Sequence, residues 1–371
     1  MNIEDLSLSY GDFTAVDRLS LHIADGESLV LLGQSGCGKT STMRCVAGLE
    51  DPSGGSISIG GTPVFDAGAG LNVAPNRRKV GLVFQSYAVW PHMTVLENVG
   101  FPLRMKKLPK QQVRTKALET LELVGLAQHA DKGASMLSGG QMQRVALARS
   151  LAMEPDVLLL DEPLSNLDAR LREDLRVELR RLQLELGLTS IYVTHDQGEA
   201  LALADRIAIM QGGRIRQLAD PVDTYRHPAS ASIAAFLGVA NIFEVATPAA
   251  GDRRLAMVDH PVEVAVDAAL PAGEHLSVCI RPEHVHLALD EPSATAATVN
   301  TWPGTVEVSV FQGSFARCSV RLDAGPLIEV QTHDDAASTL RQKDRVHVSI
   351  DPQHVQVLPR EVTSATLGQA A

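Results

Sequence analysis

Eight consecutive residues near the amino terminus have the composition and spacing of a phosphate-binding loop. They read G-x-x-x-x-G-K-T and end in Lys39 and Thr40. Glycines let backbone N–H groups converge on an anion where a Cβ would block its approach. Lys39 can reach the β- and γ-phosphates of a nucleotide, and the Thr40 hydroxyl can ligate Mg²⁺. The expected nucleotide-binding residues of this loop are Gly33, Gln34, Ser35, Gly36, Cys37, Gly38, Lys39 and Thr40.

Four further polar residues, Gln85, Asp161, Glu162 and His195, each lie at the end of a short apolar run. Polar groups at the carboxyl ends of parallel strands face the ligand crevice of an α/β sheet. Asp161 is placed to hold Mg²⁺, and Glu162 can orient or deprotonate an attacking water. Gln85 could touch Mg²⁺ or that water, or be a solvated loop residue. We expect His195 to contact the γ-phosphate.

A second anion-binding turn, Leu-Ser-Gly-Gly-Gln, occupies residues 137–141 and leads directly into a helical pattern. Backbone N–H groups at such a helix start can bind a phosphate. The expected ligands here are Ser138, Gly139, Gly140 and Gln141. Asp168 is a plausible helix N-cap. Tyr10, just before a glycine turn, could stack on an adenine base or be an ordinary strand-end aromatic.

The elements that position these residues follow from hydrophobic patterning. Apolar runs at residues 29–32, 80–84, 157–160 and 190–194 are too short for helices and indicate buried strands. Residues 3–8 and 19–23 alternate apolar and polar side chains, which predicts half-exposed, antiparallel strands. Helical patterns begin at residue 42, after Pro109 and after Asp168. The predicted fold is an α/β P-loop fold with an antiparallel β subdomain and a helical subdomain.

Composition narrows the function classes. The 371 residues include 44 Asp and Glu against 33 Lys and Arg, a formal net charge of −11, which argues against nucleic acid as a partner. Four separated cysteines indicate a reducing compartment rather than a disulfide framework. Neither a signal peptide nor a run of 18 apolar residues is present, so we expect a cytosolic protein that acts on a membrane only through a partner.

Taken together, these motifs resemble the ATP-binding cassette (ABC) family over residues 2–236. Residues 33–40 resemble its Walker A loop, residues 137–141 its signature and residues 157–162 its Walker B strand. Tyr10 resembles the adenine-stacking aromatic, Gln85 the Q-loop glutamine and His195 the switch histidine, while residues 165–168 resemble the D-loop. The resemblance implies ATP and Mg²⁺ as cofactors, with Val16, Ser41 and Asp168 also at the nucleotide. It further implies a homodimer in which the signature of one chain grips the nucleotide of the other.

Within that family the chain resembles the ATPase subunits of importers. Residues 86–103, SYAVWPHMTVLENVGFPL, resemble the segment on which a permease docks, although their apolar side chains could also be the core of a small helical subdomain. The resemblance implies two integral-membrane permeases, an indirect extracytoplasmic solute-binding protein and a peripheral location on the cytoplasmic face of the inner membrane. Gln34 and Gly198 depart from the usual importer residues without removing a reacting group.

The final third of the chain changes to a period of two, which predicts antiparallel strands in a small β-barrel. This part resembles the OB-like regulatory domain that follows importer cassettes. Residues 281–287 echo residues 351–357, an indication of internal duplication. The predicted domains are an ATPase domain at 1–236 and an OB-like regulatory (TOBE) domain at 237–371, with a disordered tail after about residue 359. The histidines at 284, 286, 347 and 354 could form a metal site, but solvated strand faces are the favoured interpretation.

Three alternatives remain beside the importer ATPase. A soluble ABC ATPase of DNA repair or translation would usually carry tandem cassettes or long coiled coils, and an exporter ATPase should lack the β-barrel. A P-loop kinase would not need residues 137–141. The sequence does not indicate the solute, so ferric iron, polyamine, sugar and phosphonate all stay open.

Overall fold

The computed structural model describes residues 1–246, 253–267, 270, 275–289, 299–333 and 340–360. The chain forms two compact units, Met1–Arg226 and His227–Ala371. The second unit begins before the expected boundary at residue 236 because helix α8 (Ala231–Phe236) packs its alanines against Cys279 of the second unit. The assignment of an ATPase domain and a regulatory domain to these ranges stays a prediction.

The central sheet of the first unit has the order β11-β10-β3-β9-β8-β7. Five strands run parallel, namely β3 (Ser28–Gly33), β7 (Val80–Val83), β8 (Val157–Asp161), β9 (Ser190–Thr194) and β10 (Arg206–Gln211). The edge strand β11 (Arg214–Ala219) is antiparallel to β10. Every residue of β3 and β9 is buried, as expected for apolar runs covered on both faces.

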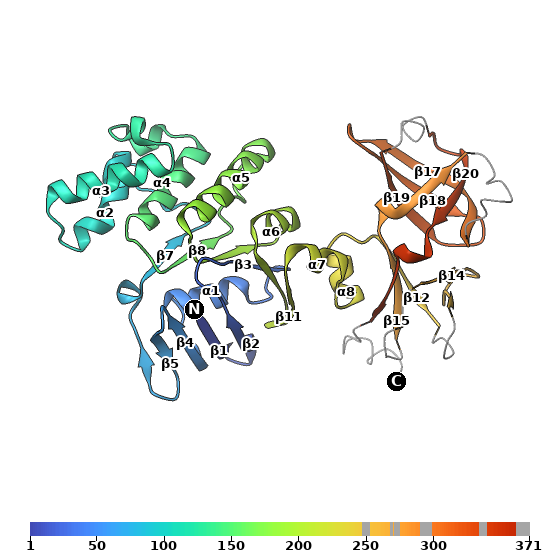
Figure 1. Cartoon of the computed structure of the whole chain (residues 1–371), viewed down its shortest axis with the longest axis horizontal. Helices are drawn as coiled ribbons and strands as arrows, with labels where there is room; N and C mark the ends of the chain where they lie inside the picture. The colour runs from blue at the N-terminus through green and yellow to red at the C-terminus, as the bar shows by residue number, and fades with distance from the viewer. Residues whose placement is uncertain (247–252, 268–269, 271–274, 290–298, 334–339, 361–371) are drawn as a thin grey trace. The chain divides into compact units, whose positions relative to one another are not determined.

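A second, antiparallel sheet has the order β2-β1-β4-β5-β6. It contains β1 (Asn2–Tyr10), β2 (Phe13–His22), β4 (Gly54–Ile59), β5 (Thr62–Asp66) and β6 (Leu71–Asn72). Helix α1 (Lys39–Ala47) lies between the two sheets, and a single hydrophobic core joins all three layers (Figure 1). Helix α1 begins at Lys39, earlier than the pattern predicted, because the last two residues of the phosphate-binding loop form its first turn.

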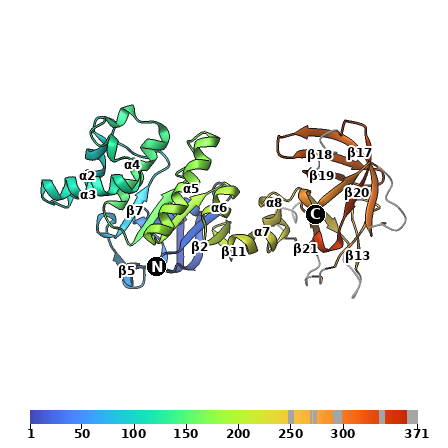
Figure 2. The same cartoon turned by 45° about the horizontal axis from the view of Figure 1, so that its top comes forward.

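The helical part of this unit packs α4 (Gly139–Leu151) against α2 (Val95–Met105) and α3 (Lys110–Leu123), as Figure 2 shows. Short 3-10 turns at Pro75–Arg77, Ala127–His129 and Ala134–Met136 complete the connections. Helices α5 (Ala169–Leu186), α6 (Gln197–Leu203) and α7 (Pro221–Arg226) follow. These elements confirm the predicted cassette with its antiparallel and helical parts.

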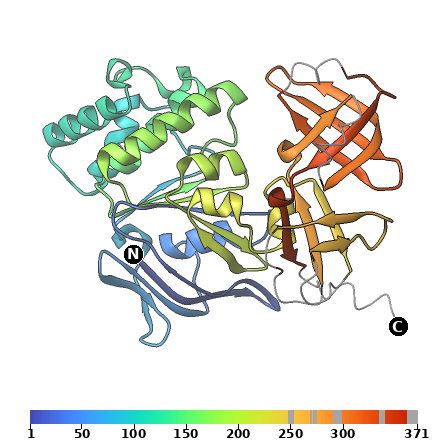
Figure 3. The same cartoon turned by 45° about the vertical axis from the view of Figure 1, so that its right-hand side comes forward.

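The second unit is rich in β-structure, as predicted (Figure 3). One sheet pairs β12 (Asn241–Val245), β15 (Leu276–Ile280) and β21 (Val355–Pro359). A larger sheet pairs β16 (Val285–Ala288), β20 (Arg345–Ile350), β17 (Asn300–Phe311), β18 (Ala316–Leu322) and β19 (Leu327–Thr332), and a hairpin joins β13 (Arg254–Ala256) to β14 (Glu263–Ala265). The predicted disordered tail lies almost wholly outside the described residues.

The internal echo corresponds to two similar structural segments. Each copy forms a 3-10 turn followed by a strand, Pro282–His284 before β16 and Pro352–His354 before β21. The rings of His284 and His354 stack at a centroid distance of 4.0 Å. The two copies therefore meet through the same residue of each.

Candidate functional site

The phosphate-binding loop, residues 33–40, connects β3 to α1 and has a backbone that only glycine allows at two positions. Gly38 has φ +102°, and a Cβ there would lie 2.3 Å from the Ala15 carbonyl oxygen. A Cβ on Gly33 would lie 2.4 Å from the carbonyl oxygen of Met210. These collisions with backbone atoms cannot be relieved by a side-chain rotation, so the close approach of β2 and β10 to the loop requires both glycines.

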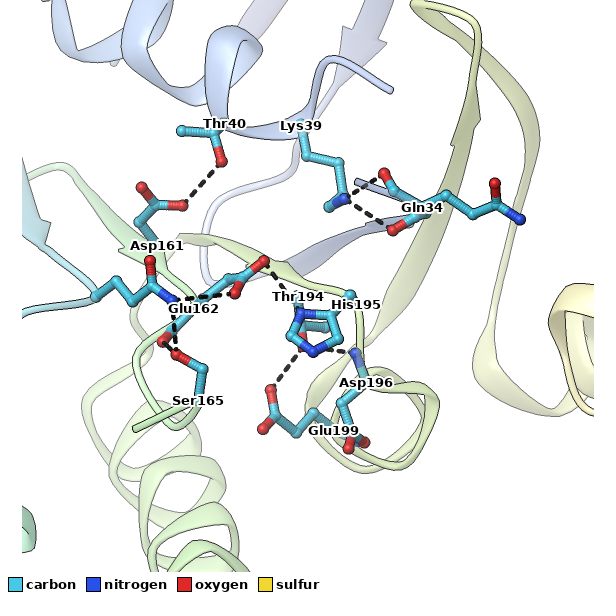
Figure 4. A network of polar contacts seen from close by, with 12 residues as sticks. Gln34, Lys39, Thr40, Asp161, Glu162, Ser165, Thr194, His195, Asp196 and Glu199 are labelled. Carbon is cyan, nitrogen blue, oxygen red and sulfur yellow. Dashed lines mark hydrogen bonds and ion pairs between the residues drawn. The ribbon is translucent and has the colours of Figure 1, made fainter. Parts of the chain in front are cut away.

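Lys39 is the buried cation of this loop, with only 5% of its surface exposed. Its Nζ donates to the carbonyl oxygens of Gly33, at 2.7 Å, and Gln34, at 2.9 Å (Figure 4). The Cys37 Sγ lies 3.8 Å from the same nitrogen, and Cys37 itself is buried. An ammonium group held inside a glycine-rich loop is arranged to neutralise a phosphate.

Thr40 and Asp161 come together although they are 121 residues apart. Thr40 Oγ1 donates to Asp161 Oδ1 at 3.1 Å, which joins the first turn of α1 to the end of β8 (Figure 4). Burial raises the pKa of Asp161, although the Thr40 hydrogen bond opposes that shift. A hydroxyl beside a carboxylate is a donor set of hard oxygens, which fits Mg²⁺.

Glu162 lies between two other predicted site residues. Its Oε1 is 3.2 Å from His195 Nδ1, and its Oε2 is 3.5 Å from Gln85 Nε2. Glu162 has φ +43°, a left-handed conformation that is unusual for a residue with a side chain, while its backbone N–H donates to Val193 O at 3.0 Å. Three residues predicted from separate strand ends therefore form one cluster.

Two neighbours of this cluster were not among the predicted ligands. Ser165 Oγ accepts from Gln85 Nε2 at 3.1 Å and donates to the Glu162 carbonyl oxygen at 2.9 Å. Asn166 Nδ2 donates to the Gln85 carbonyl oxygen at 2.9 Å. They hold the Gln85 segment against the turn after β8. The sequence signal for both residues was their place in the segment 165–168, which resembles the D-loop and begins three residues after Glu162.

The signature residues, 137–141, start helix α4. Ser138 and Gln141 form a reciprocal capping box, with Ser138 Oγ accepting from the Gln141 N–H at 3.4 Å. A Cβ on Gly140 would lie 3.0 Å from Leu171 of α5, so this glycine permits close helix packing. Helix α4 packs on α2, α3 and β7, whereas α1 packs on β2, β3, β8 and β9. The two anion-binding turns thus belong to different parts of one unit, and no hydrogen bond or ion pair within the described ranges joins them.

The remaining predicted nucleotide ligands differ in how far they are exposed to solvent. Tyr10 is 48% exposed at the end of β1, where its ring is accessible for stacking. Asp168 caps α5 by accepting from the Leu171 N–H at 3.0 Å. Val16 is fully buried in the core between the sheets, and Ser41 is half-buried in the first turn of α1. Their contacts with a nucleotide stay predictions.

A groove of about 550 Å³ lies beside the expected docking segment, residues 86–103. Trp90, Phe101, Met105 and Arg149 are among the residues that line it. The rings of Trp90 and Phe101 lie 4.4 Å apart, and the Arg149 guanidinium lies 4.7 Å from the centre of the Trp90 ring. Buried Asn98 fixes Trp90 by accepting from its N–H at 2.9 Å and donating to its carbonyl oxygen at 3.1 Å.

Arg149 also ties this groove to helix α4. It donates to the carbonyl oxygens of Ala88, at 2.7 Å, and Tyr87, at 3.0 Å, both of which have positive φ. Burial lowers the pKa of Arg149. The strained backbone after Gln85 is therefore held by the same helix whose first residues form the signature.

The fold and the arrangement of these motifs define an ABC ATPase, and comparison with known proteins agrees. The family model "ABC transporter" matches residues 16–165, and the "TOBE domain" model matches residues 278–358. The spermidine/putrescine import ATP-binding protein PotA of Treponema pallidum is 41% identical over 362 residues, covering 94% of each chain. The trehalose/maltose import ATP-binding protein MalK of Thermococcus litoralis is 44% identical over 296 residues, covering 78% of this chain and 79% of its own.

Among solved structures, a dimeric ATP-binding cassette in a post-hydrolysis state, bound to ADP and Pi, is 31% identical with a TM-score of 0.51. The match covers 59% of this chain and 98% of the other. The chain belongs to the import ATP-binding proteins of the ABC transporter family, and it is the ATP-hydrolysing subunit of an importer. No helix in the described ranges is long and apolar enough to cross a membrane.

Proposed function

We propose that this chain hydrolyses ATP with Glu162 as the group that orients and deprotonates the attacking water. The observation that carries the proposal is the position of Glu162, held between His195 and Gln85 and one residue beyond the Thr40–Asp161 pair. A carboxylate so placed can accept a proton from water as the water attacks the γ-phosphorus in line.

The other charged groups bind the phosphates and neutralise their charge. The Lys39 ammonium exchanges its carbonyl partners for oxygens of the β- and γ-phosphates, and His195 donates to the γ-phosphate as negative charge moves toward the leaving ADP. The oxygens of Thr40 and Asp161 fit Mg²⁺, which would supply further neutralisation of charge on the phosphates. Gln85 orients the water from the side opposite His195. The products are ADP and phosphate.

Two copies of the chain form the working unit in this proposal. The signature at the start of α4 is a second anion-binding turn with no nucleotide partner on its own chain, so it is free to cap a nucleotide bound to another copy. The dimeric, ADP-bound structure of a cassette with 31% identity supports this arrangement. Two ATP molecules then lie between two chains.

The groove of about 550 Å³ beside residues 86–103 is the proposed docking site for a membrane permease. Its aromatic and aliphatic lining suits an apolar helix of a partner, and the exposed Met105 adds adaptable surface at its edge. Arg149 connects the groove to α4, so docking and signature position change together. A chain docked in this way is peripheral to the cytoplasmic face of the inner membrane, with two permeases fed by an extracytoplasmic binding protein.

Polyamine is the proposed solute. The match to the Treponema pallidum spermidine/putrescine relative spans 94% of both chains and therefore includes the second unit. A sugar is the second candidate, because the trehalose/maltose relative is 44% identical over a shorter range. The solute itself is selected by the permease and binding protein.

The test is co-purification from detergent-solubilised membranes, followed by mass spectrometry and uptake of labelled spermidine and maltose by the reconstituted complex. Recovery of permeases together with ATP-dependent spermidine uptake is the expected result. Uptake of maltose alone would replace polyamine by sugar and leave the importer intact. Recovery of ribosomes or nucleic acid in place of permeases would contradict the docking proposal.

A further inference from the structure

Glu199, in the first turn of α6, is a buried carboxylate that the proposed mechanism does not use. Only 3% of its surface is exposed, and within the described ranges it forms no ion pair with Lys or Arg. Its Oε2 accepts from Thr194 Oγ1 at 2.7 Å and from the Tyr192 hydroxyl at 2.9 Å. A carboxylate removed from water without a salt bridge to a cation is costly to bury.

The hydrogen bonds of Glu199 continue on both sides of His195 (Figure 4). Thr194 Oγ1 donates to Glu199 and also accepts from the Asp196 N–H at 2.9 Å. Asp196 Oδ1 in turn accepts from the Glu199 N–H at 2.9 Å. The residue before His195 and the residue after it are therefore both fixed to the start of α6 by one closed set of hydrogen bonds.

The His195 side chain makes few contacts that could fix its position. It is 61% exposed, and its contact in the cluster is the one to Glu162 Oε1 at 3.2 Å. The backbone consequently determines where the His195 Cβ lies and from which point the imidazole reaches Glu162. That backbone is set by Thr194, Asp196 and Glu199.

We propose that Glu199 is a positioning residue that aims His195 at the γ-phosphate through its hydrogen bonds with Thr194 and Tyr192. The inference rests on the proposed role of His195 in hydrolysis. Nucleotide binding itself depends on the phosphate-binding loop and Tyr10, which lie on other elements. Weakening the hydrogen bonds among Thr194, Asp196 and Glu199 is therefore expected to lower kcat and to leave the KM for ATP unchanged.

The sharpest test replaces Thr194 by valine, which keeps the β-branched shape that suits β9 and removes the hydroxyl. Thr194→Ser, the matched control, keeps the hydroxyl. The Thr194→Val variant is expected to lose kcat by about 10-fold or more, because sub-ångström to ångström displacements of catalytic groups carry losses of that order. Its KM for ATP should stay within about twofold of wild type, as should both constants of Thr194→Ser.

A double-mutant cycle with His195→Ala separates positioning from a general structural role. If Glu199 and Thr194 act through His195, Thr194→Val causes no further loss in the His195→Ala chain. Glu199→Gln retains an acceptor oxygen and should recover activity that Glu199→Leu loses. These measurements use the full chain, with ATP binding recorded for every variant.

Three results would each overturn the proposal. The Thr194→Val variant could keep the wild-type kcat, or it could lose ATP binding. Its loss of kcat could also add fully to that of His195→Ala. Normal hydrolysis by His195→Ala alone would contradict the proposed mechanism, and this inference with it. Failure of the inference alone is recognised by a His195→Ala chain with lowered kcat together with a Thr194→Val chain that keeps the wild-type kcat.

Discussion

At the scale of single residues, Glu162 is the proposed general base, and its replacement by glutamine is the direct test. The amide keeps the size and the hydrogen-bonding contacts to His195 and Gln85 but cannot accept a proton from water. We expect Glu162→Gln to lose turnover by about 10²-fold or more, in line with the removal of a general base. Phosphate release under saturating Mg-ATP measures this.

The matched control is Glu154→Gln, which changes an exposed glutamate whose partner is Lys116. Its turnover should equal that of the wild type, because an exposed ion pair of this kind contributes little to stability. Brisk hydrolysis by Glu162→Gln would assign the base to another residue.

Cys37 offers a second residue-scale prediction. A thiol reagent should inhibit hydrolysis, because a substituent on Sγ enters the space beside Lys39, and bound ATP should protect. Burial raises the pKa of Cys45 and of Cys279 to about 12, so neither thiol competes as a thiolate near neutral pH. The measurement is residual ATPase activity with mass-spectrometric mapping of the label.

In the Cys37→Ser chain the hydroxyl is smaller and unreactive, so this variant should hydrolyse ATP and resist the reagent. Equal labelling of Cys37 with and without ATP would contradict its place under the bound phosphates.

The local part of the site could be predicted from the sequence. Buried strands were recognisable as short apolar runs, and each delivered its polar residue, Gln85, Asp161, Glu162 or His195, to the same sheet edge. The phosphate-binding loop was recognisable because its glycines, Lys39 and Thr40 are contiguous. Those features depend on neighbours in the chain, which a sequence displays directly.

What the sequence did not predict depends on contacts between distant residues. The Arg149 bonds to Ala88 and Tyr87 span 61 and 62 positions, and no local pattern marks them. The complete burial of Val16 could not be predicted either, because it results from packing between two sheets. Strands β5 and β6 were also missed, because glycine and polar residues interrupt the alternation that normally indicates a strand.

At the scale of elements, Arg149 is expected to connect α4 to the docking segment. Arg149→Met keeps the apolar length of the side chain and removes the donors to Ala88 and Tyr87. We expect faster hydrogen exchange in residues 85–90 and lower recovery of permeases in co-purification, because the left-handed backbone loses the bonds that hold it. Nucleotide affinity should remain unchanged.

Arg114→Met, which alters an exposed arginine of α3, is the matched control and should leave exchange and permease recovery as in the wild type. Unchanged exchange in the Arg149→Met chain would show that the segment is held by other contacts, such as those of Asn98.

The stacked histidines of the second unit predict a pH dependence. Burial, and then the neighbouring His354, lower the pKa of His284, so the folded state binds its proton less readily than the unfolded chain. A depressed histidine pKa means that stability is fully present above the unfolded value of about 6.5 and is lost as the pH falls through it. We expect the unfolding temperature of the second unit to decrease on acidification from pH 7.5 to 5.5.

His284→Phe preserves a ring for stacking and removes the titration, so its unfolding temperature should fall less over the same interval. An identical pH profile in both chains, measured by differential scanning calorimetry, would assign the acid sensitivity to other groups.

At the scale of the whole molecule, one chain carries two anion-binding turns that do not meet. The phosphate-binding loop belongs to the layer between the sheets, and the signature belongs to the helical part. In the proposed arrangement a complete ATP site requires a second copy of the chain, and ATP joins the two copies. We expect hydrolysis to separate the two copies again and to return the docked permeases to their starting state.

The most direct measurement is the mass of the Glu162→Gln chain by analytical ultracentrifugation with and without Mg-ATP, together with the nucleotide content of each species. We predict a dimer that holds two ATP molecules, and we predict that adding Ser138→Arg to the same chain leaves a monomer with ATP still bound. The shared site would be contradicted if the Glu162→Gln chain bound ATP and stayed monomeric. It would also be contradicted if the dimer still formed after Ser138→Arg was added.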